Sequence, residues 1–110
     1  MNLPNAELAT VEPAKVRDYL LNRSHPVGRF KAAFFETLGY QADAWEVLQA
    51  DLLELGRTAP CRVGQPSEFG AKYEVSGILS GRSGRSAAIT TIWIILGDDP
   101  APRFVTAYPS

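Results

Sequence analysis

The chain contains one cysteine and one histidine among its 110 residues, and no apolar run long enough to span a bilayer. The lone Cys61 excludes an internal disulfide framework and is typical of a reducing compartment, for which the bacterial cytoplasm is the default. The longest apolar run, Ile92–Leu96, has the length of a buried strand, and no basic-then-apolar leader begins the chain. We therefore expect a cytoplasmic protein without membrane association.

The sequence also lacks the usual motifs that bind metals and nucleotide cofactors. One histidine and one cysteine cannot form a zinc site without carboxylates, and the carboxylates fall at surface spacing on one predicted helix. Gly81 and Gly84 fit a hairpin loop and not a phosphate-binding loop. The sequence therefore predicts no metal and no cofactor.

Charge is nearly balanced in total but uneven along the chain. The formal net charge of −1 argues against a protein that coats nucleic acid without specificity. Residues 15–35 contain five cations and residues 56–85 another five, whereas residues 36–55 contain five acids and no cation. If the two basic segments meet in space, they form a local positive patch; the alternative is a set of scattered, solvated charges.

Three helices are predicted in the N-terminal half. The first begins at Pro13, includes Tyr19 in its apolar stripe, and ends before a Ser-His-Pro segment. The second covers about Val27–Leu38, and the third runs from Asp43 as N-cap to Gly56. The apolar positions of the second helix recur at helical spacing: Val27, Phe30, Phe34 and Leu38.

After a loop over Thr58–Gly70, the pattern becomes that of strands. Lys72–Leu79 alternates between apolar and polar residues, as a half-buried strand does. Arg85–Leu96 is long, β-branched and almost continuously apolar, which is typical of a central strand. Arg103–Tyr108 is the last predicted strand.

Helices followed by an antiparallel meander predict an α+β fold of two layers, with about three N-terminal helices packed on one face of a small sheet. The length of 110 residues is close to the commonest domain size. We expect a single domain over residues 1–110, with a helical half (1–56) and a sheet half (57–110).

Several segments occur in order through the chain: His25–Ala32, Phe34–Tyr40, Lys72–Tyr73, Gly84–Arg85, Thr91–Ile94 and Arg103–Pro109. Together they resemble a small bacterial family whose members are known only as a domain of unknown function. The resemblance covers nearly the whole chain and implies no established activity.

More loosely, the chain resembles the barnase/EndoU/colicin/RelE-like ribonuclease fold of bacterial toxins. That resemblance implies N-terminal helices followed by a four-stranded antiparallel sheet. It also implies a site made of a histidine or lysine from the helices and basic or hydroxyl residues from the strands. The C-terminal Thr106–Pro109 is similar to the Thr-aromatic-Pro ending of EndoU-type toxin domains. Because a fold does not define an activity, function has to be argued from the site.

Metal-independent RNA cleavage requires a base, an acid, and cations or N–H groups that stabilise the charge developing on the phosphate. His25 is the natural proton carrier, because histidine titrates near neutral pH. Its place at a helix start favours the neutral imidazole, and N–H groups near Gly28 offer a place for a phosphate. Arg29, one turn on, is a candidate phosphate clamp, and Lys31 is a weaker, substrate-binding candidate on another side of the helix.

The strands supply the remaining candidates. Lys72 and Arg85 begin strands and are candidate phosphate contacts. Thr106 and Tyr108 share one face of the last strand, where Thr106 would orient a phosphate oxygen and Tyr108 would stack a base or donate a proton. Arg82, in the hairpin loop, is a candidate substrate contact.

Each of these residues also has a purely structural explanation. A Ser-His-Pro segment before a helix is an ordinary capping turn, in which His25 accepts from helix N–H groups. Arg29 and Lys31 fit a solvated helix face, and Thr106 and Tyr108 fit strand formers at a sheet edge. Convergence of the set on one hollow would favour catalysis.

Two functions from different classes are compatible with the sequence. The first is a small ribonuclease-like toxin of a toxin–antitoxin system, with RNA as substrate, His25 as base or acid, and a cognate antitoxin as partner. The second is a non-catalytic interaction module, such as an antitoxin, an immunity protein or a chaperone, whose acidic third helix faces a basic partner. An exposed sheet edge would also allow two copies to pair as a homodimer.

Overall fold

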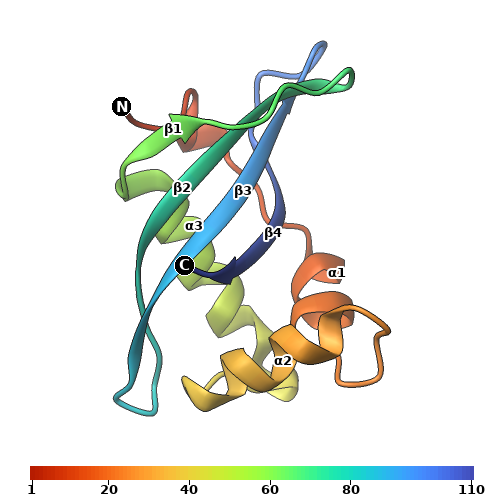
Figure 1. The fold of residues 1–110 in the computed structure, drawn as a ribbon, viewed down its shortest axis with the longest axis vertical. Coiled ribbons are helices and arrows are strands. Elements are labelled where there is room, and N and C mark those ends of the chain that lie inside the picture. Colours follow the sequence, from red (N-terminus) through yellow and green to blue (C-terminus); the bar gives the residue numbers. More distant parts are fainter.

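The computed structural model describes all 110 residues and places the helices before the sheet, which confirms the predicted α+β fold. The elements, in chain order, are η1 (Ala6–Leu8), α1 (Pro13–Lys15), η2 (Val16–Leu20), α2 (Gly28–Thr37), η3 (Ala42–Ala44), α3 (Trp45–Thr58), β1 (Cys61–Val63), β2 (Gly70–Ser80), β3 (Ser86–Leu96) and β4 (Arg103–Pro109). In Figure 1, α3 lies behind the sheet, while α1 and α2 lie beside and below the β4 edge.

The sheet is an antiparallel meander with the strand order β1-β2-β3-β4. β2 and β3 pair over eleven residues each, from Gly70 opposite Leu96 to Ser80 opposite Ser86. β1 is short and covers only the first half of β2, pairing Cys61 with Val75. The second half of β2 therefore has a strand neighbour on one side only.

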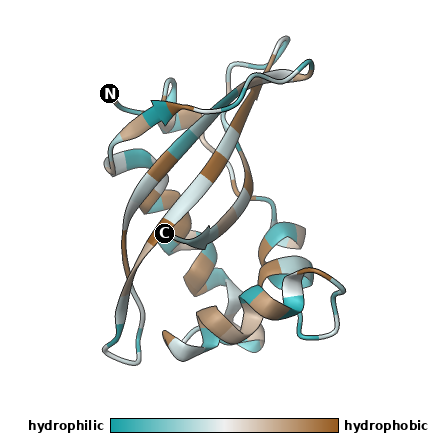
Figure 2. Cartoon of the chain, viewed as in Figure 1, coloured by the Kyte–Doolittle hydropathy of each residue, from teal (hydrophilic) through white to brown (hydrophobic).

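The core lies between the inner face of the sheet and α3. Trp93 and Phe104 pack edge to face with ring centroids 5.5 Å apart, and Leu48 and Leu52 of α3 are fully buried. A Cβ at Gly56 would lie 2.3 Å from the Trp93 ring, so glycine lets the helix pass directly over the indole. The helix continues to Thr58, two residues beyond the glycine at which the sequence predicted its end. Figure 2 shows the corresponding alternation of hydrophobic and hydrophilic residues along the central strands.

The predicted apolar face of the second helix is partly wrong. Val27 is 57% exposed and Phe30 is 69% exposed, whereas Ala32 and Phe35 are completely buried. The inward face begins instead at Gly28, where an added Cβ would lie 2.0 Å from the Tyr19 carbonyl oxygen. Small residues therefore bring α2 close to the preceding helical segment, and this rotates Val27 and Phe30 to the surface.

The first helix begins at Pro13 as predicted but widens into a π-helical turn, η2, in which the Leu21 N–H donates to the Val16 carbonyl (2.9 Å). The predicted loop after α3 contains β1, so Cys61 lies in a strand and not in a loop. The side chain of Cys61 is buried, and burial raises the pKa of its thiol above the usual value. No helix combines the length and the apolar character needed to cross a bilayer.

Candidate functional site

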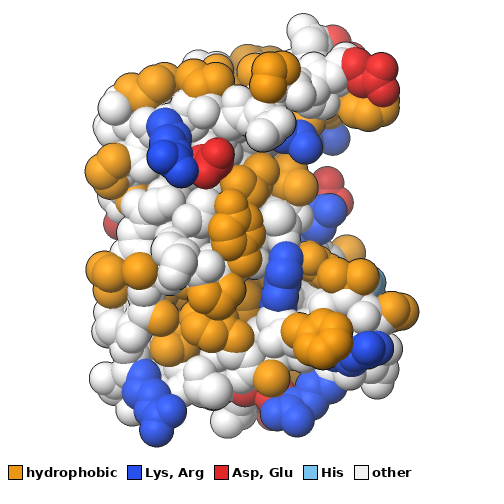
Figure 3. Space-filling view, in the orientation of Figure 1, with side chains coloured by type: hydrophobic (Ala, Val, Ile, Leu, Met, Phe, Trp, Pro, Cys, Tyr) orange, Lys and Arg blue, Asp and Glu red, His pale blue; other side chains and the backbone are white.

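A hollow of about 450 Å³ lies where α1, η2 and α2 meet the β4 edge. We call it the Lys31 hollow; its lining residues are Lys15, Tyr19, His25, Val27, Lys31, Val105 and Thr106. Figure 3 shows that this side of the molecule is indented between the upper end of the sheet and α2, with Lys and Arg side chains along the indentation. The hollow thus joins chain segments that are far apart in the sequence.

Lys31 is the centre of a triangle of polar groups in this hollow. Its Nζ donates to the Thr106 hydroxyl (2.6 Å) and to the Tyr19 hydroxyl (2.8 Å). The two hydroxyl oxygens are themselves 3.3 Å apart. An ammonium group has three protons, so one N–H of Lys31 is left for a ligand.

A β-bulge aims Thr106 at this triangle. Phe104 lies opposite Trp93 and is buried, while Thr106 pairs with Ile92, which leaves Val105 as the extra residue of the bulge. In a regular strand Phe104 and Thr106 would point to the same face, because side chains alternate. The bulge therefore turns the Thr106 hydroxyl away from the core and toward α2.

The environment of Tyr19 makes its phenol more acidic. Burial raises the pKa of Tyr19, but hydrogen bonds from Lys31 and Thr106 and the charges of Lys31 and Lys15 outweigh it, so the net pKa lies below the usual value. The Lys31 ammonium also lies 5.1 Å from the Tyr19 ring centroid. A phenol of this kind is a better proton donor than an ordinary tyrosine.

The hollow is positively charged. The four ion pairs of the protein all use arginines: Arg17–Asp18, Arg23–Glu36, Arg62–Glu74 and Arg103–Asp99. Neither Lys15 nor Lys31 has a carboxylate partner, and no carboxylate lines the hollow. Two uncompensated ammonium groups next to two hydroxyls are suited to binding an anion such as a phosphate.

His25 lies at the rim of the hollow, but its ring already has a structural task. Its Nδ1 accepts the N–H groups of Val27 (3.0 Å) and Gly28 (2.9 Å), which is the capping turn anticipated as the structural alternative. Because Nδ1 accepts, the ring proton of the neutral imidazole belongs on Nε2. His25 therefore offers an N–H donor and not a free base. The sequence predicted that N–H groups near Gly28 could bind a phosphate. The Val27 and Gly28 amides are not available for this, because both donate to the His25 imidazole.

The structure brings three of the eight predicted site residues together, namely His25, Lys31 and Thr106. The other five lie outside the hollow. Arg29 is exposed, with its guanidinium 4.7 Å from the Phe30 ring centroid. Lys72 lines a separate depression beside Val63 and Gly64. Of the remaining three, Arg82 and Arg85 belong to the β2–β3 hairpin, and Tyr108 lies opposite Thr90 on β4.

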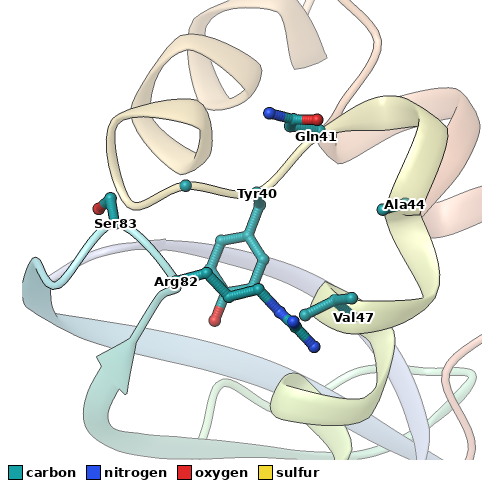
Figure 4. Close-up of a pocket in the computed structure, with 7 residues that line it drawn as sticks. Tyr40, Gln41, Ala44, Val47, Arg82 and Ser83 are labelled. Carbon is teal, nitrogen blue, oxygen red and sulfur yellow. The ribbon is translucent and has the colours of Figure 1, made fainter.

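Arg82 contributes to a second hollow, of about 500 Å³, between the hairpin, the end of α2 and the start of α3. Figure 4 shows Arg82 and Tyr40 on its wall, with the arginine extending toward Val47. The buried Tyr40 hydroxyl donates to the Asp51 carboxylate (2.6 Å). Burial, and then this contact with Asp51, raises the pKa of Tyr40 well above the usual value. This pair is a structural contact that joins α3 to the end of α2.

Sequence reasoning missed Lys15 and Tyr19. Tyr19 was predicted in the apolar stripe of the first helix, and its ring does pack there, partly buried against the core. Only its hydroxyl reaches the hollow. The spacing of Lys15 and Tyr19, four residues apart on one helix, was the available signal, since such residues share a helix face. No group of three or more His, Cys, Asp or Glu side chains is arranged to hold a metal ion.

Comparison with known structures identifies the fold. The chain is similar to one in a solved structure described as a contact-dependent growth inhibition toxin–immunity protein complex from Klebsiella pneumoniae 342. The TM-score is 0.70 at 18% sequence identity, and the alignment covers 96% of each chain. At this identity the similarity concerns the fold alone.

The sequence also defines the family. Residues 2–110 match the family called Domain of unknown function (DUF6883), so the chain belongs to that family. This confirms the resemblance to a domain family of unknown function that the ordered sequence segments suggested. No curated protein matches the sequence.

Proposed function

We propose that the protein is a small, metal-independent ribonuclease of the toxin type, and that RNA is cleaved in the Lys31 hollow. The observation that carries the proposal is the triangle of Lys31, Tyr19 and Thr106, in a hollow with a second lysine and no carboxylate. Its size, charge and donors fit a phosphodiester. The fold is similar to that of a chain in a toxin–immunity protein complex, which fits a toxin and equally fits an immunity protein.

In this proposal the 2′-hydroxyl of the RNA attacks the adjacent phosphate, and the bond from phosphorus to the 5′-oxygen breaks. Lys31 and Lys15 stabilise the charge that develops on the phosphate oxygens. Tyr19 donates its proton to the leaving 5′-oxygen, for which its lowered pKa suits it. A water molecule in the open hollow acts as the base and takes the proton of the 2′-hydroxyl.

The other residues have supporting roles in this proposal. Thr106 holds the Lys31 ammonium through its 2.6 Å hydrogen bond. His25 donates from Nε2 to a phosphate oxygen, while the two hydrogen bonds that its Nδ1 accepts hold the ring in place. Arg29 and Arg85 contact the RNA backbone away from the scissile phosphate.

The test is to incubate the purified protein with total bacterial RNA in EDTA and to analyse the new ends. The proposal expects cleavage that persists in EDTA and leaves 2′,3′-cyclic phosphate and 5′-hydroxyl ends. Intact RNA at micromolar protein, or cleavage that needs a divalent metal, would contradict it.

A second candidate function, a protein-interaction module of the immunity or antitoxin type, is favoured by the acidic side of α3. Asp51 and Glu54 line a groove between α3 and the half of β2 that β1 leaves uncovered, next to Ile78, which is 66% exposed. This surface suits a basic partner. For this function, Glu54→Lys should abolish capture of a partner from the host cell, Lys31→Met should leave capture unchanged, and the wild type should not cleave RNA. Equal capture by both variants would contradict it.

A further inference from the structure

Two large apolar side chains are exposed on α2 and at its entry. Phe30 is 69% exposed and Val27 is 57% exposed, although Phe35 and Phe104 are buried in the core. Burying a side chain of this size stabilises a protein, so its exposure forgoes stability. Adjacent exposed apolar residues of this kind mark a binding surface more often than isolated ones do.

These side chains adjoin the Lys31 hollow. Val27 is itself one of the lining residues. Phe30 and Lys31 follow Val27 by three and four residues, and residues with these spacings are neighbours on a helix surface. The exposed apolar surface is therefore continuous with the hollow that contains the Lys31 ammonium.

The Phe30 ring also has a cation beside it. The Arg29 guanidinium carbon lies 4.7 Å from the ring centroid, and Arg29 is in none of the four ion pairs. Figure 3 shows hydrophobic and cationic side chains next to one another over α2. An exposed aromatic ring flanked by a guanidinium is the arrangement on which proteins stack the bases of single-stranded nucleic acids.

We propose that Phe30, with Val27 and Arg29, is a stacking site for an unpaired base next to the phosphate in the Lys31 hollow. The substrate class is therefore single-stranded RNA, because a paired base in a duplex does not expose its face. This inference rests on the proposed ribonuclease function. It assigns substrate binding to Phe30 and leaves the proton transfer to Tyr19.

The experiment compares Phe30→Ala with Phe69→Ala. Phe69 is the matched control, since it is 71% exposed but precedes β2 and does not line the hollow. Binding is measured by fluorescence anisotropy with a labelled, random-sequence 2′-O-methyl RNA 12-mer, which cannot undergo transesterification. Cleavage is measured with the matching unmodified RNA.

Phe30→Ala should weaken binding and raise KM by at least about 5-fold, with a smaller change in kcat. Phe69→Ala should match the wild type, and Phe30→Trp should bind at least as well as the wild type. A wild-type preference for the single strand over a duplex of the same sequence is also expected.

Two kinds of failure are distinguishable. If the wild type neither binds nor cleaves RNA, the proposed function fails and this inference with it. If the wild type cleaves and Lys31→Met does not, but Phe30→Ala behaves like Phe69→Ala, only the stacking site is refuted. If Phe30→Ala unfolds, Phe30→Gln replaces it; wild-type affinity for that variant, or equal affinity for duplex RNA, would also refute the stacking site.

Discussion

Replacing Tyr19 with phenylalanine removes one oxygen from the Lys31 hollow and little else. The ring, partly buried against the core, stays in place, while the Lys31 ammonium loses its 2.8 Å contact and keeps its 2.6 Å bond to Thr106. A hydrogen bond to a charged group contributes about 1.5–3 kcal/mol to stability. The melting temperature of Tyr19→Phe should therefore lie about 5–15 °C below that of the wild type.

The effect on RNA cleavage should be far larger. A positioned acid contributes about 10²- to 10⁴-fold to a rate, so kcat should fall by at least about 100-fold while RNA binding changes little. The matched control is Tyr108→Phe, which removes the same hydroxyl from a side chain outside the hollow. It should cleave RNA at the wild-type rate.

The pH dependence tests the same assignment. An acid works only in its protonated form, so activity falls as pH rises through its pKa. The hydrogen bonds and charges around Tyr19 lower the pKa of its phenol. The wild-type rate should therefore begin to fall at a lower pH than it would if the acid were a tyrosine with the usual pKa. In Tyr19→Phe this part of the alkaline fall should disappear. A wild-type rate for Tyr19→Phe, or an unchanged pH profile, would refute the assignment of the acid.

Two further predictions concern the framework of the site. Gly28→Ala should lower the free energy of unfolding by about 1–3 kcal/mol and reduce cleavage, because its Cβ would lie 2.0 Å from the Tyr19 carbonyl oxygen; an unchanged urea midpoint would contradict the close packing. Tyr40→Phe should cost about 1–3 kcal/mol in urea denaturation, because the Asp51 carboxylate loses its 2.6 Å donor, and should leave kcat unchanged. If the folded Tyr40→Phe variant lost cleavage, the chemistry would lie in the hollow beside Arg82 and not in the Lys31 hollow.

The sequence was sufficient for the order of elements and the type of sheet. Alternation in Lys72–Leu79 and the long apolar run before Gly97 predict two strands, and both are present: β2 is longer than predicted, and β3 is one residue shorter. The strand β1 was missed because three residues give no periodicity. The orientation of α2 was also missed: hydrophobic spacing favours Val27 and Phe30, but the Gly28 contact with Tyr19 determines which side is buried.

The site was only partly predictable for a similar reason. Lys31 and Thr106 were recognised as candidates, yet their convergence depends on the bulge at Val105, which the sequence pattern does not reveal. Arg29 follows His25 by one turn but points toward Phe30. Tyr19 was assigned to the core, and its ring does pack there. The sequence pattern does not reveal that the hydroxyl of the same side chain reaches the hollow.

The most direct test of the account compares Lys31→Met with Lys72→Met in RNA cleavage. Both variants lose one positive charge and keep an aliphatic side chain, but only Lys31 lies in the hollow. Removing one charged donor from such a site costs about 10²- to 10³-fold in kcat, which corresponds to about 2.7–4 kcal/mol. We expect this loss for Lys31→Met and a rate within a few-fold of the wild type for Lys72→Met. Equal rates for the two variants would contradict the central claim that the Lys31 hollow is where RNA is cleaved.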